Sequence, residues 1–489
     1  MKNTEDKILF VLKNENFIAP NGLCRISAMA RQAGYNVSLC EVNSQDVLKR
    51  IAEFNPKIIA YSACSGEAKH YLKLNRKIKE RFPHIFSIMG GPHATFYPQV
   101  VKDDYLDAAC VGEGEGAFFD FLKSQRQKTS LRNIPNIVTK DTLVDGYQLR
   151  GLIEDLDSLP LPDYELIYDN TPLGKYPLKS VITSRGCPYN CAYCFNAAWR
   201  KMYQGKGTLL RRHSVDYVVD EIRHIKGKWP LSFVKFYDDI FAYKADSWLE
   251  EFSKKYKEKI NLPFFILTRA DLLTEDMVKL LKAAGCRTIS MSIEAGNSRI
   301  RRDILRRDMS DEQIIRAHHL CKDYGIYTFT NCIIGLPETA LEHDIKSVDL
   351  AIQSKADWAE FPIFYPYPGT ELGEKAIKNK LYSPDFEQMH TSYQYKSSMS
   401  CFSEKDKNAQ MNLALLGAVA VVFPRFKNIF TRRLIFWRHN FLFTFLYYLT
   451  KMRVFRKKIY VTQTNFWTNS SIYLKSLRQE WFRHENCRG

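Results

Sequence analysis

The sequence contains no apolar run long enough to cross a membrane and no segment typical of export. Two apolar runs near its end, 413–423 and 441–449, fall short of the roughly twenty residues that a spanning helix needs. The first residues, 1–13, place acidic side chains before a short apolar strand, where an export signal would have a basic segment and a cleavage site. We therefore expect the protein in the cytoplasm.

Low-complexity tracts and repeats of solenoid period are also missing, which argues against a disordered or fibrous protein. With 489 residues, 45% of them apolar, the chain is long enough for two or three domains with their own cores. A disulfide framework is not expected, because nine of the twelve cysteines are scattered and no export signal accompanies them. Only three cysteines form a cluster.

Acidic residues are scarce in the last part of the chain. From Lys405 onward there are sixteen Lys or Arg residues and three acidic ones, which accounts for +13 of the total net charge of +17. The rest of the chain is nearly balanced. The basic charge is therefore a property of a C-terminal extension, and it gives little support to nucleic-acid binding by the whole protein.

Residues 1–127 alternate short β-branched runs with stretches of helical length. Continuous apolar strands separated by helices indicate a parallel sheet covered on both faces, as in a doubly wound, flavodoxin-like fold. Such folds bind ligands beyond the carboxyl ends of their strands. The expected strands are ILFVLK (8–13), NVSLC (36–40), KIIAYSA (57–63), FSIMG (86–90) and DAACVG (107–112).

Three loops that follow these strands, 62–66, 90–95 and 111–116, are small, polar and contain glycine. Glycine at such positions lets a flat ligand approach the backbone, but it also suits a tight strand-to-helix turn with no ligand. The residues alone leave both interpretations open.

After a linker, 128–176, the alternation of strands and helices starts again and continues over 177–385. Six strand-helix units of this kind predict a partial (β/α)6 barrel similar to a TIM barrel, with functional groups at the carboxyl ends of its strands. The last segment, 386–489, is basic, aromatic and helical in character. The expected barrel strands are 179–184, 233–237, 264–268, 288–292, 327–334 and 358–363.

The three clustered cysteines, Cys187, Cys191 and Cys194, lie on the loop after the first expected barrel strand. Three thiols at this spacing can bind three irons of a [4Fe-4S] cubane and leave the fourth iron open for a chelating ligand. A structural zinc site is the alternative, but it needs four ligands, and no fourth cysteine or histidine is close in the sequence.

This CxxxCxxC loop, with Tyr193 before its last cysteine, resembles that of the radical S-adenosylmethionine (SAM) superfamily. The resemblance implies that the three cysteines bind a [4Fe-4S] cluster, that its open iron binds the amino and carboxylate groups of SAM, and that strand-end residues hold the rest of SAM. Asp238 and Asp239 stand where relatives have an FxDDxF stretch near the methionine end. The alternative for two adjacent aspartates is a turn or a helix cap.

Further strand-end residues match the same superfamily. Arg269 could pair with the methionine carboxylate, although a solvated surface arginine is an equal alternative. Glu294 occupies the position that reads GxESG in relatives and contacts the ribose, and Gly335 begins a GLPET stretch that resembles the motif beside the adenine. The segment 365–370 matches the PxPGT sequence of cobalamin-linked members. These short matches occur along the chain in the same order as the corresponding motifs of the superfamily.

In the first segment, GGPHAT followed by VGEGE resembles the cobalamin-binding module that is fused to one branch of the superfamily. The D-x-H-x-x-G motif, whose histidine would serve as the lower axial ligand of cobalt, is absent from the sequence. The resemblance thus implies a cobalamin bound without a protein histidine, and His93 could equally be a loop histidine bonded to the backbone. The residues expected near the corrin are Ser62, Ser65, Gly90, Gly91, His93 and Thr95.

The chemistry that the resemblance implies is cleavage of SAM to methionine and a 5′-deoxyadenosyl radical and, with methylcobalamin, methyl transfer to an unactivated carbon or phosphorus centre. One alternative is a cobalamin-linked radical enzyme that does not methylate, similar to the porphyrin ring cyclase. Others are a methylthiotransferase with a second cluster on Cys24, Cys64 and Cys110, and a non-catalytic sensor. Expected partners are a small-molecule or lipid substrate and an electron donor such as flavodoxin or ferredoxin.

The C-terminal extension has two interpretations of equal weight. Basic residues between 425 and 458 are interleaved with aromatic ones, which suits an amphipathic helix on an anionic membrane and would place the protein on the inner membrane surface. Alternatively, the extension is a helical cap that packs on the barrel and keeps a solvated basic face. RNA contact is a distant third interpretation.

Overall fold

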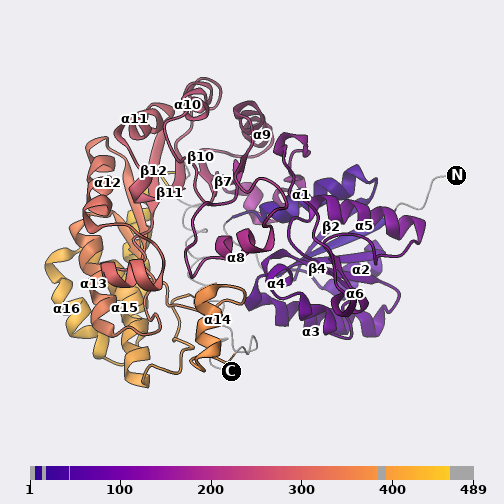
Figure 1. Cartoon of the computed structure of the whole chain (residues 1–489). Coiled ribbons are helices and arrows are strands. Elements are labelled where there is room, and N and C mark those ends of the chain that lie inside the picture. The colour runs from indigo at the N-terminus through magenta and orange to yellow at the C-terminus, as the bar shows by residue number, and fades with distance from the viewer. Residues whose placement is uncertain (1–5, 14–17, 43, 384–392, 463–489) are drawn as a thin grey trace.

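The computed structural model describes residues 6–13, 18–42, 44–383 and 393–462, which form two α/β units and a helical extension. Figure 1 shows the N-terminal unit, in indigo, on the right and the barrel on the left. The short helix α8 (Phe195–Met202) lies between them. The helices of the extension, in yellow, lie on the side of the barrel that faces away from the N-terminal unit.

The N-terminal sheet has the strand order β2-β1-β3-β4-β5-β6. The first five strands are parallel, which confirms the prediction of a doubly wound sheet. The sixth strand, β6, pairs antiparallel with β5 and lies in the segment that was expected to be a linker. The order reverses beside β1, where such sheets open a crevice at their carboxyl ends. The strands are β1 (Lys7–Leu12), β2 (Asn36–Glu41), β3 (Ile58–Ser62), β4 (Phe86–Gly90), β5 (Ala108–Cys110) and β6 (Ile137–Val138).

Alternate residues of the central strand β1 face two different helical layers. Ile8 and Phe10 share a core with α1 and α5, whereas Leu9 and Val11 share one with α2, α3 and α4. Burial on both faces explains why the strand reads as a continuous apolar run. The helices are α1 (Asn21–Gln32), α2 (Val47–Phe54), α3 (Ser65–Arg81), α4 (Gly91–Phe96), α5 (Glu115–Gln127) and α6 (Lys140–Asp145).

The second sheet has its strands in the order β14-β13-β12-β11-β10-β7, so each strand lies beside its successor, as expected for a partial barrel. All of its pairings are parallel. The strands are β7 (Leu178–Val181), β10 (Phe233–Phe236), β11 (Phe264–Thr268), β12 (Cys286–Met291), β13 (Tyr327–Asn331) and β14 (Trp358–Glu360).

Helices connect the barrel strands, and several begin where the sequence provides a capping side chain. Ser214, Thr274 and Ser310 each accept a hydrogen bond from a backbone amide in the first helical turn. A two-stranded hairpin of β8 (Ser184–Arg185) and β9 (Arg211–Arg212) flanks the cysteine loop. The helices are α7 (Glu165–Tyr168), α9 (Val215–Lys228), α10 (Ser247–Lys259), α11 (Glu275–Ala284), α12 (Asp311–Asp323), α13 (Leu341–Gln353) and α14 (Glu371–Lys378).

The C-terminal extension packs on the barrel through α15 (Glu404–Val422), which is buried against α13 and β14. The helices α16 (Lys427–Arg432) and α17 (Phe441–Val454) pack on α15 in turn. The Tyr447 hydroxyl donates to Glu360 at 2.6 Å, so α17 is tied to the end of β14. No helix in the described ranges is both long enough and apolar enough to span a bilayer.

Candidate active site between the two domains

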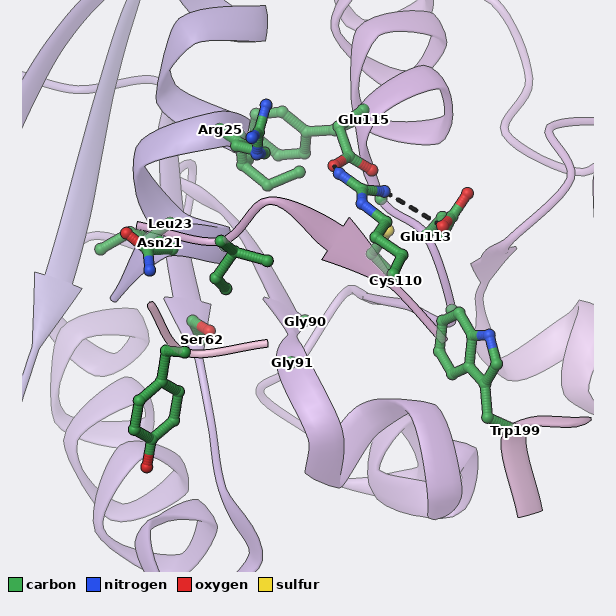
Figure 2. Close-up of a pocket in the computed structure, with 18 of the residues that line it drawn as sticks. Asn21, Leu23, Arg25, Ser62, Gly90, Gly91, Cys110, Glu113, Glu115 and Trp199 are labelled. Atoms are coloured by element: carbon green, nitrogen blue, oxygen red, sulfur yellow. Dashed lines mark hydrogen bonds and ion pairs between the residues drawn. The ribbon is translucent and has the colours of Figure 1, made fainter. Parts of the chain in front are cut away.

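A cavity of about 410 Å³ lies where the carboxyl ends of the N-terminal strands face the barrel. Figure 2 shows Ser62, Gly90 and Gly91 at the strand ends, with Trp199 of α8 on the opposite side. The barrel contributes residues of the cysteine loop and of the loop after β10. They include Ser184, Arg185, Gly186, Asn196, Arg211 and Asp239.

The glycines of the strand-end loops serve different purposes. Gly91 has a φ of +88°, and a Cβ there would lie 2.9 Å from the Ala63 nitrogen. Gly112 has a φ of +72°, and a Cβ would lie 1.8 Å from the Tyr203 hydroxyl. Tight packing within the protein thus requires both glycines, whereas a Cβ on Gly90 would meet nothing closer than 3.8 Å.

Three of the residues predicted near a corrin do not line the cavity. His93 is 2% exposed, its Nδ1 lies 3.1 Å from the Ser65 hydroxyl, and burial lowers its pKa to about 4. Thr95 accepts a hydrogen bond from the Gly112 amide at 3.0 Å. Ser65, His93 and Thr95 therefore hold the loops in place from within the domain. Of that predicted set, the cavity wall contains Ser62, Gly90 and Gly91.

The wall formed by the first sheet fits a flat group such as a corrin. Most lining residues in or directly after β3, β4 and β5 are small, namely Ala60, Ser62, Gly90, Gly91 and Cys110, and the two larger ones are Tyr61 and Ile88. A histidine of the barrel, His213, lines the cavity, and its two ring nitrogens lie 2.8 Å from Asp157 and 3.0 Å from Arg25. Cobalamin binding without an axial ligand from the protein stays a prediction.

The cysteine loop is fixed at both ends by backbone contacts. Gly186 has a φ of +92°, and a Cβ there would lie 2.1 Å from the Leu209 oxygen, so a glycine is required directly before Cys187. The Ala192 amide donates to the Leu305 oxygen at 3.0 Å, and Cys194 precedes the first residue of α8. The loop therefore holds its three thiols on a rigid frame.

The donor set fits an iron-sulfur cluster better than a single metal ion. Burial raises the pKa of Cys187, and it raises that of Cys194 to about 12, so these thiols stay protonated unless a metal takes them as thiolates. Within the described ranges, no three His, Cys, Asp or Glu side chains gather around one point as a zinc site requires. Thiolates that bind separate irons do not need a common centre.

Tyr193 connects the cysteine loop to the end of β12. Its hydroxyl donates to Glu294 Oε1 at 2.8 Å, and Glu294 has a φ of +65°, a conformation that few residues other than glycine adopt. Burial raises the pKa of Glu294. Arg307, which the sequence did not single out, donates to the Ser292 oxygen at 3.1 Å and adds a positive charge beside this pair.

The two adjacent aspartates point in different directions. Asp238 Oδ1 accepts from the Thr183 amide at 2.9 Å and from the Ser184 hydroxyl at 2.6 Å, so this side chain fastens the segment that leads into the cysteine loop. Burial raises the pKa of Asp238 to about 6. Asp239, in contrast, lines the cavity. The structure therefore assigns Asp238 a positioning contact and leaves Asp239 facing the ligand space.

Arg269 lies under the cysteine loop with its charge already paired. Its guanidinium donates to both carboxylate oxygens of Asp271 at 2.9 Å, lies 3.6 Å from the centre of the Tyr189 ring, and approaches the Cys191 sulfur to 4.0 Å. With 4% exposure it is not a solvated surface arginine. Its pairing with the SAM carboxylate stays a prediction.

Gly335 lies where the C-terminal extension meets the barrel. Its φ is +67°, a Cβ would lie 3.2 Å from the Gln410 side chain of α15, and its amide donates to Asp344 Oδ1 at 3.0 Å. This glycine is thus required by packing within the protein, and its contact with adenine stays a prediction.

We expect Asp344 to make the stability of the fold depend on pH. Burial raises its pKa to about 7 from an ordinary 3.8, so between these values the folded protein keeps a proton that the unfolded chain releases. Stability then falls as pH rises, by about 1.4 kcal/mol per pH unit. We expect Asp344→Asn to be more stable than the parent in urea unfolding at pH 8 and to lose this advantage at pH 4. An equal difference at both values would contradict the assignment.

A network of buried ion pairs joins the two domains beside the cavity. Arg185 donates to Glu113 at 3.0 Å and also pairs with Glu115, and Arg211 donates to Glu113 at 2.8 Å. Burial alone would raise the pKa of Glu115, but the charge and hydrogen bond of Arg185 hold it below its ordinary value. Figure 2 shows Glu113 and Glu115 on the same side of the cavity. Glu113 and Glu115 belong to the VGEGE motif and Arg185 lies two residues before Cys187, but the sequence does not indicate that they pair.

Lys235 is a further residue that sequence reasoning missed. Its amine lies 4.5 Å from the ring centre of Tyr237, 5.1 Å from that of Phe265 and 5.3 Å from that of Tyr460. Burial and the charge of Lys451 lower the pKa of Lys235 to about 7. Lys235 is not among the described residues that line the cavity, and the contacts of its amine are with rings of the protein itself.

Two protein families match the two α/β units. Residues 9–122 match the B12 binding domain, and residues 181–351 match the Radical SAM superfamily. An uncharacterized methyltransferase of Pyrococcus horikoshii is 28% identical over 74% of this chain and 79% of its own length. An anaerobic magnesium-protoporphyrin IX monomethyl ester cyclase of Rubrivivax gelatinosus is 26% identical over 71% of this chain and 63% of its own length.

A solved structure has the same arrangement of domains. TsrM from Kitasatospora setae, a radical S-adenosylmethionine methyltransferase with cobalamin and a [4Fe-4S] cluster bound, superposes with a TM-score of 0.65 over 99% of this chain and 100% of its own, at 15% identity. This likeness shows the fold. With the two family matches, it confirms the resemblance carried by the CxxxCxxC loop. The chain therefore contains a B12-binding domain, matched over residues 9–122, followed by a radical SAM domain, matched over residues 181–351.

Proposed function

We propose that the protein is a cobalamin-dependent radical SAM methyltransferase that acts on an unactivated carbon or phosphorus centre of a small molecule or lipid. The observation that carries the proposal is a cavity that both domains line. Gly90 at the end of β4 and Gly186 next to the cysteine loop line the same space of about 410 Å³. A methyl carrier held by the first domain and SAM held by the second would both have access to it.

The residues for each cofactor follow from their positions. Cys187, Cys191 and Cys194 would bind the cluster, and the wall with Ser62 and Gly90 would receive the corrin. When bound, the cluster with SAM supplies one-electron cleavage chemistry and cobalamin supplies a methyl carrier. Tyr193, by donating to Glu294, orients one carboxylate oxygen and leaves the other for vicinal hydroxyls. Asp239 and Arg269 are proposed to contact the methionine end, and Asp238 to position their loop.

A cyclase-like enzyme without methyl transfer is the second candidate, favoured by the cyclase of Rubrivivax gelatinosus among the relatives. A second cluster is a weaker one, because the thiols it would use are spread out. Cys24 is buried within α1, Cys64 is exposed at the start of α3, and Cys110 lines the cavity. About four irons per chain would support one cluster, and about eight would support two.

Two partners are part of the proposal. The chemistry requires an electron donor, for which a flavodoxin or ferredoxin is suitable because both transfer single electrons. A membrane surface is the other proposed partner, and it would involve a different face of the molecule.

An anaerobic reaction with methyl-labelled SAM tests the function. We expect the reconstituted, reduced protein to form 5′-deoxyadenosine, and labelled methyl groups to enter a small molecule or lipid of cell extracts. S-adenosylhomocysteine should accumulate as cobalamin is remethylated. Formation of 5′-deoxyadenosine without label transfer would favour the cyclase-like alternative. Absence of 5′-deoxyadenosine despite a complete cluster would favour a sensor and contradict the proposal.

A further inference from the structure

The C-terminal extension exposes most of the protein's large apolar side chains. Thirteen such side chains are exposed within the described ranges, and nine of them lie between residues 423 and 449. Several are more than half exposed, including Trp437 at 60% and Leu442 at 68%. The nine are Phe423, Phe426, Ile429, Phe436, Trp437, Phe441, Leu442, Phe445 and Leu449. We call them the apolar patch.

The fold itself does not require this patch. The face of α17 with Phe443, Tyr447 and Tyr448 is buried on the rest of the protein. Phe441, Leu442, Phe445 and Leu449 recur at helical spacing on the outer face. The helix is therefore apolar on two sides, and only one of them is used for packing. α16 and the short turn 434–436 pack beside α17 on α15, so the patch is carried by one layer of elements.

Basic side chains lie between and just after the residues of the patch in the sequence, and most of the exposed ones have no carboxylate partner among the described residues. The segment 407–462 contains eleven Lys or Arg residues and no Asp or Glu. Lys427 and Lys458 pair with Asp349 and Asp357 of the barrel, both at 2.7 Å. Among the exposed ones, six have no ion pair with any described residue. These are Arg425, Arg433, Arg438, Arg453, Arg456 and Lys457.

We propose that this surface docks on an anionic lipid bilayer. Exposed aromatic and aliphatic side chains flanked by unpaired cations are the composition that inserts shallowly into a headgroup region while its charges meet lipid phosphates. Protein interfaces are also enriched in aromatic residues and Arg, so self-association is the alternative that the test has to exclude. The docked surface lies on the extension, outside the cavity, so it leaves the active site of the proposed enzyme accessible.

The test uses the full-length protein and vesicle sedimentation. We expect binding to vesicles of phosphatidylcholine with about one third phosphatidylglycerol, weak binding to phosphatidylcholine alone, and loss of binding as salt shortens the range of charge attraction. A triple variant, Phe441→Ser, Leu442→Ser and Phe445→Ser, should reduce the bound fraction at least tenfold. The pair Arg433→Glu and Arg438→Glu should do the same.

Matched variants on other faces serve as controls. Val144→Ser removes an apolar side chain that is 83% exposed, and Lys257→Glu reverses an exposed charge on α10. Both should bind vesicles like the parent. Absence of binding at low salt, or equal binding by parent and triple variant, would overturn the proposal. A dimer in sedimentation velocity that the triple variant dissolves, without vesicle binding, would overturn it in favour of self-association. Because no substrate is needed, failure here leaves the proposed enzymatic function untouched.

Discussion

Replacing any one of Cys187, Cys191 and Cys194 with alanine is expected to abolish 5′-deoxyadenosine formation and to prevent assembly of the cluster. Iron and sulfide in the reconstituted protein should fall from about four per chain toward zero, because a cubane held by three thiolates on one loop loses its stability with the loss of one. The broad charge-transfer absorption of the cluster should disappear in parallel. Iron quantification and absorption spectra of anaerobically reconstituted protein measure both effects.

The matched control is Cys401→Ala, which removes an exposed thiol outside the barrel. It should leave iron content and activity unchanged. Cys64→Ala is a second control with a different purpose, because Cys64 is exposed at a strand end of the first domain. Loss of half the iron in that variant would mean a second cluster. Full iron content in all three loop variants would contradict the assignment of the cluster to this loop.

Arg185→Met should give the largest loss of stability of any substitution at the domain interface. It leaves Glu115 buried with its cation removed, and breaking a buried ion pair in this way costs about 3–5 kcal/mol. Glu113 keeps Arg211 as a partner, so the effect should arise mainly from Glu115. The midpoint of urea unfolding at pH 7 measures the loss.

The pH dependence of this loss follows from Glu115. Arg185 holds the pKa of this carboxyl below its ordinary value, so the pair stabilises the fold above that value and ceases to do so as pH falls and Glu115 takes up a proton. The destabilisation should therefore be large at pH 7 and small near pH 4. Glu115→Gln, added to Arg185→Met, should recover part of the stability at pH 7.

A half-exposed ion pair provides the comparison. Arg150 and Asp120, joined at 2.8 Å, are 28% and 41% exposed, and Arg150→Met should cost no more than about 1 kcal/mol. Equal costs for Arg185→Met and Arg150→Met would show that the buried network does not hold the domains together.

The strands could be predicted closely because parallel strands buried on both faces read as continuous apolar runs. The expected strand 86–90 coincides with β4, and 264–268 coincides with β11. The starts of two barrel helices carry an equally local signal, because Thr274 and Ser310 are capping residues. Both signals depend only on neighbouring residues, so they can be recognised without knowledge of the tertiary structure.

The candidate site was predictable in position but not in detail. A sequence shows that His93 and Asp238 follow strand ends, but it does not show which way a side chain points. Both turn inward, where they bond Ser65 and the 183–184 segment. The pairing of Arg185 with Glu113 joins residues 72 positions apart, and nothing in the local pattern of either residue indicates it.

The C-terminal extension shows a similar limit. Its two apolar runs look alike in the sequence, yet the structure buries α15 almost completely and leaves one side of α17 uncovered. Which of two apolar helices reaches the core depends on the shape of the barrel beside β14, and composition does not carry that information.

The ion pairs of Arg185 affect how this architecture can be recombined. Arg185 lies two residues before Cys187 in the barrel domain, while both of its carboxylate partners belong to the N-terminal domain. A chimera that exchanges the N-terminal domain at the linker would separate a cation from the acids that neutralise it, directly beside the cluster loop. Successful exchange between relatives should therefore require Arg185, Arg211, Glu113 and Glu115 to be transplanted as one unit.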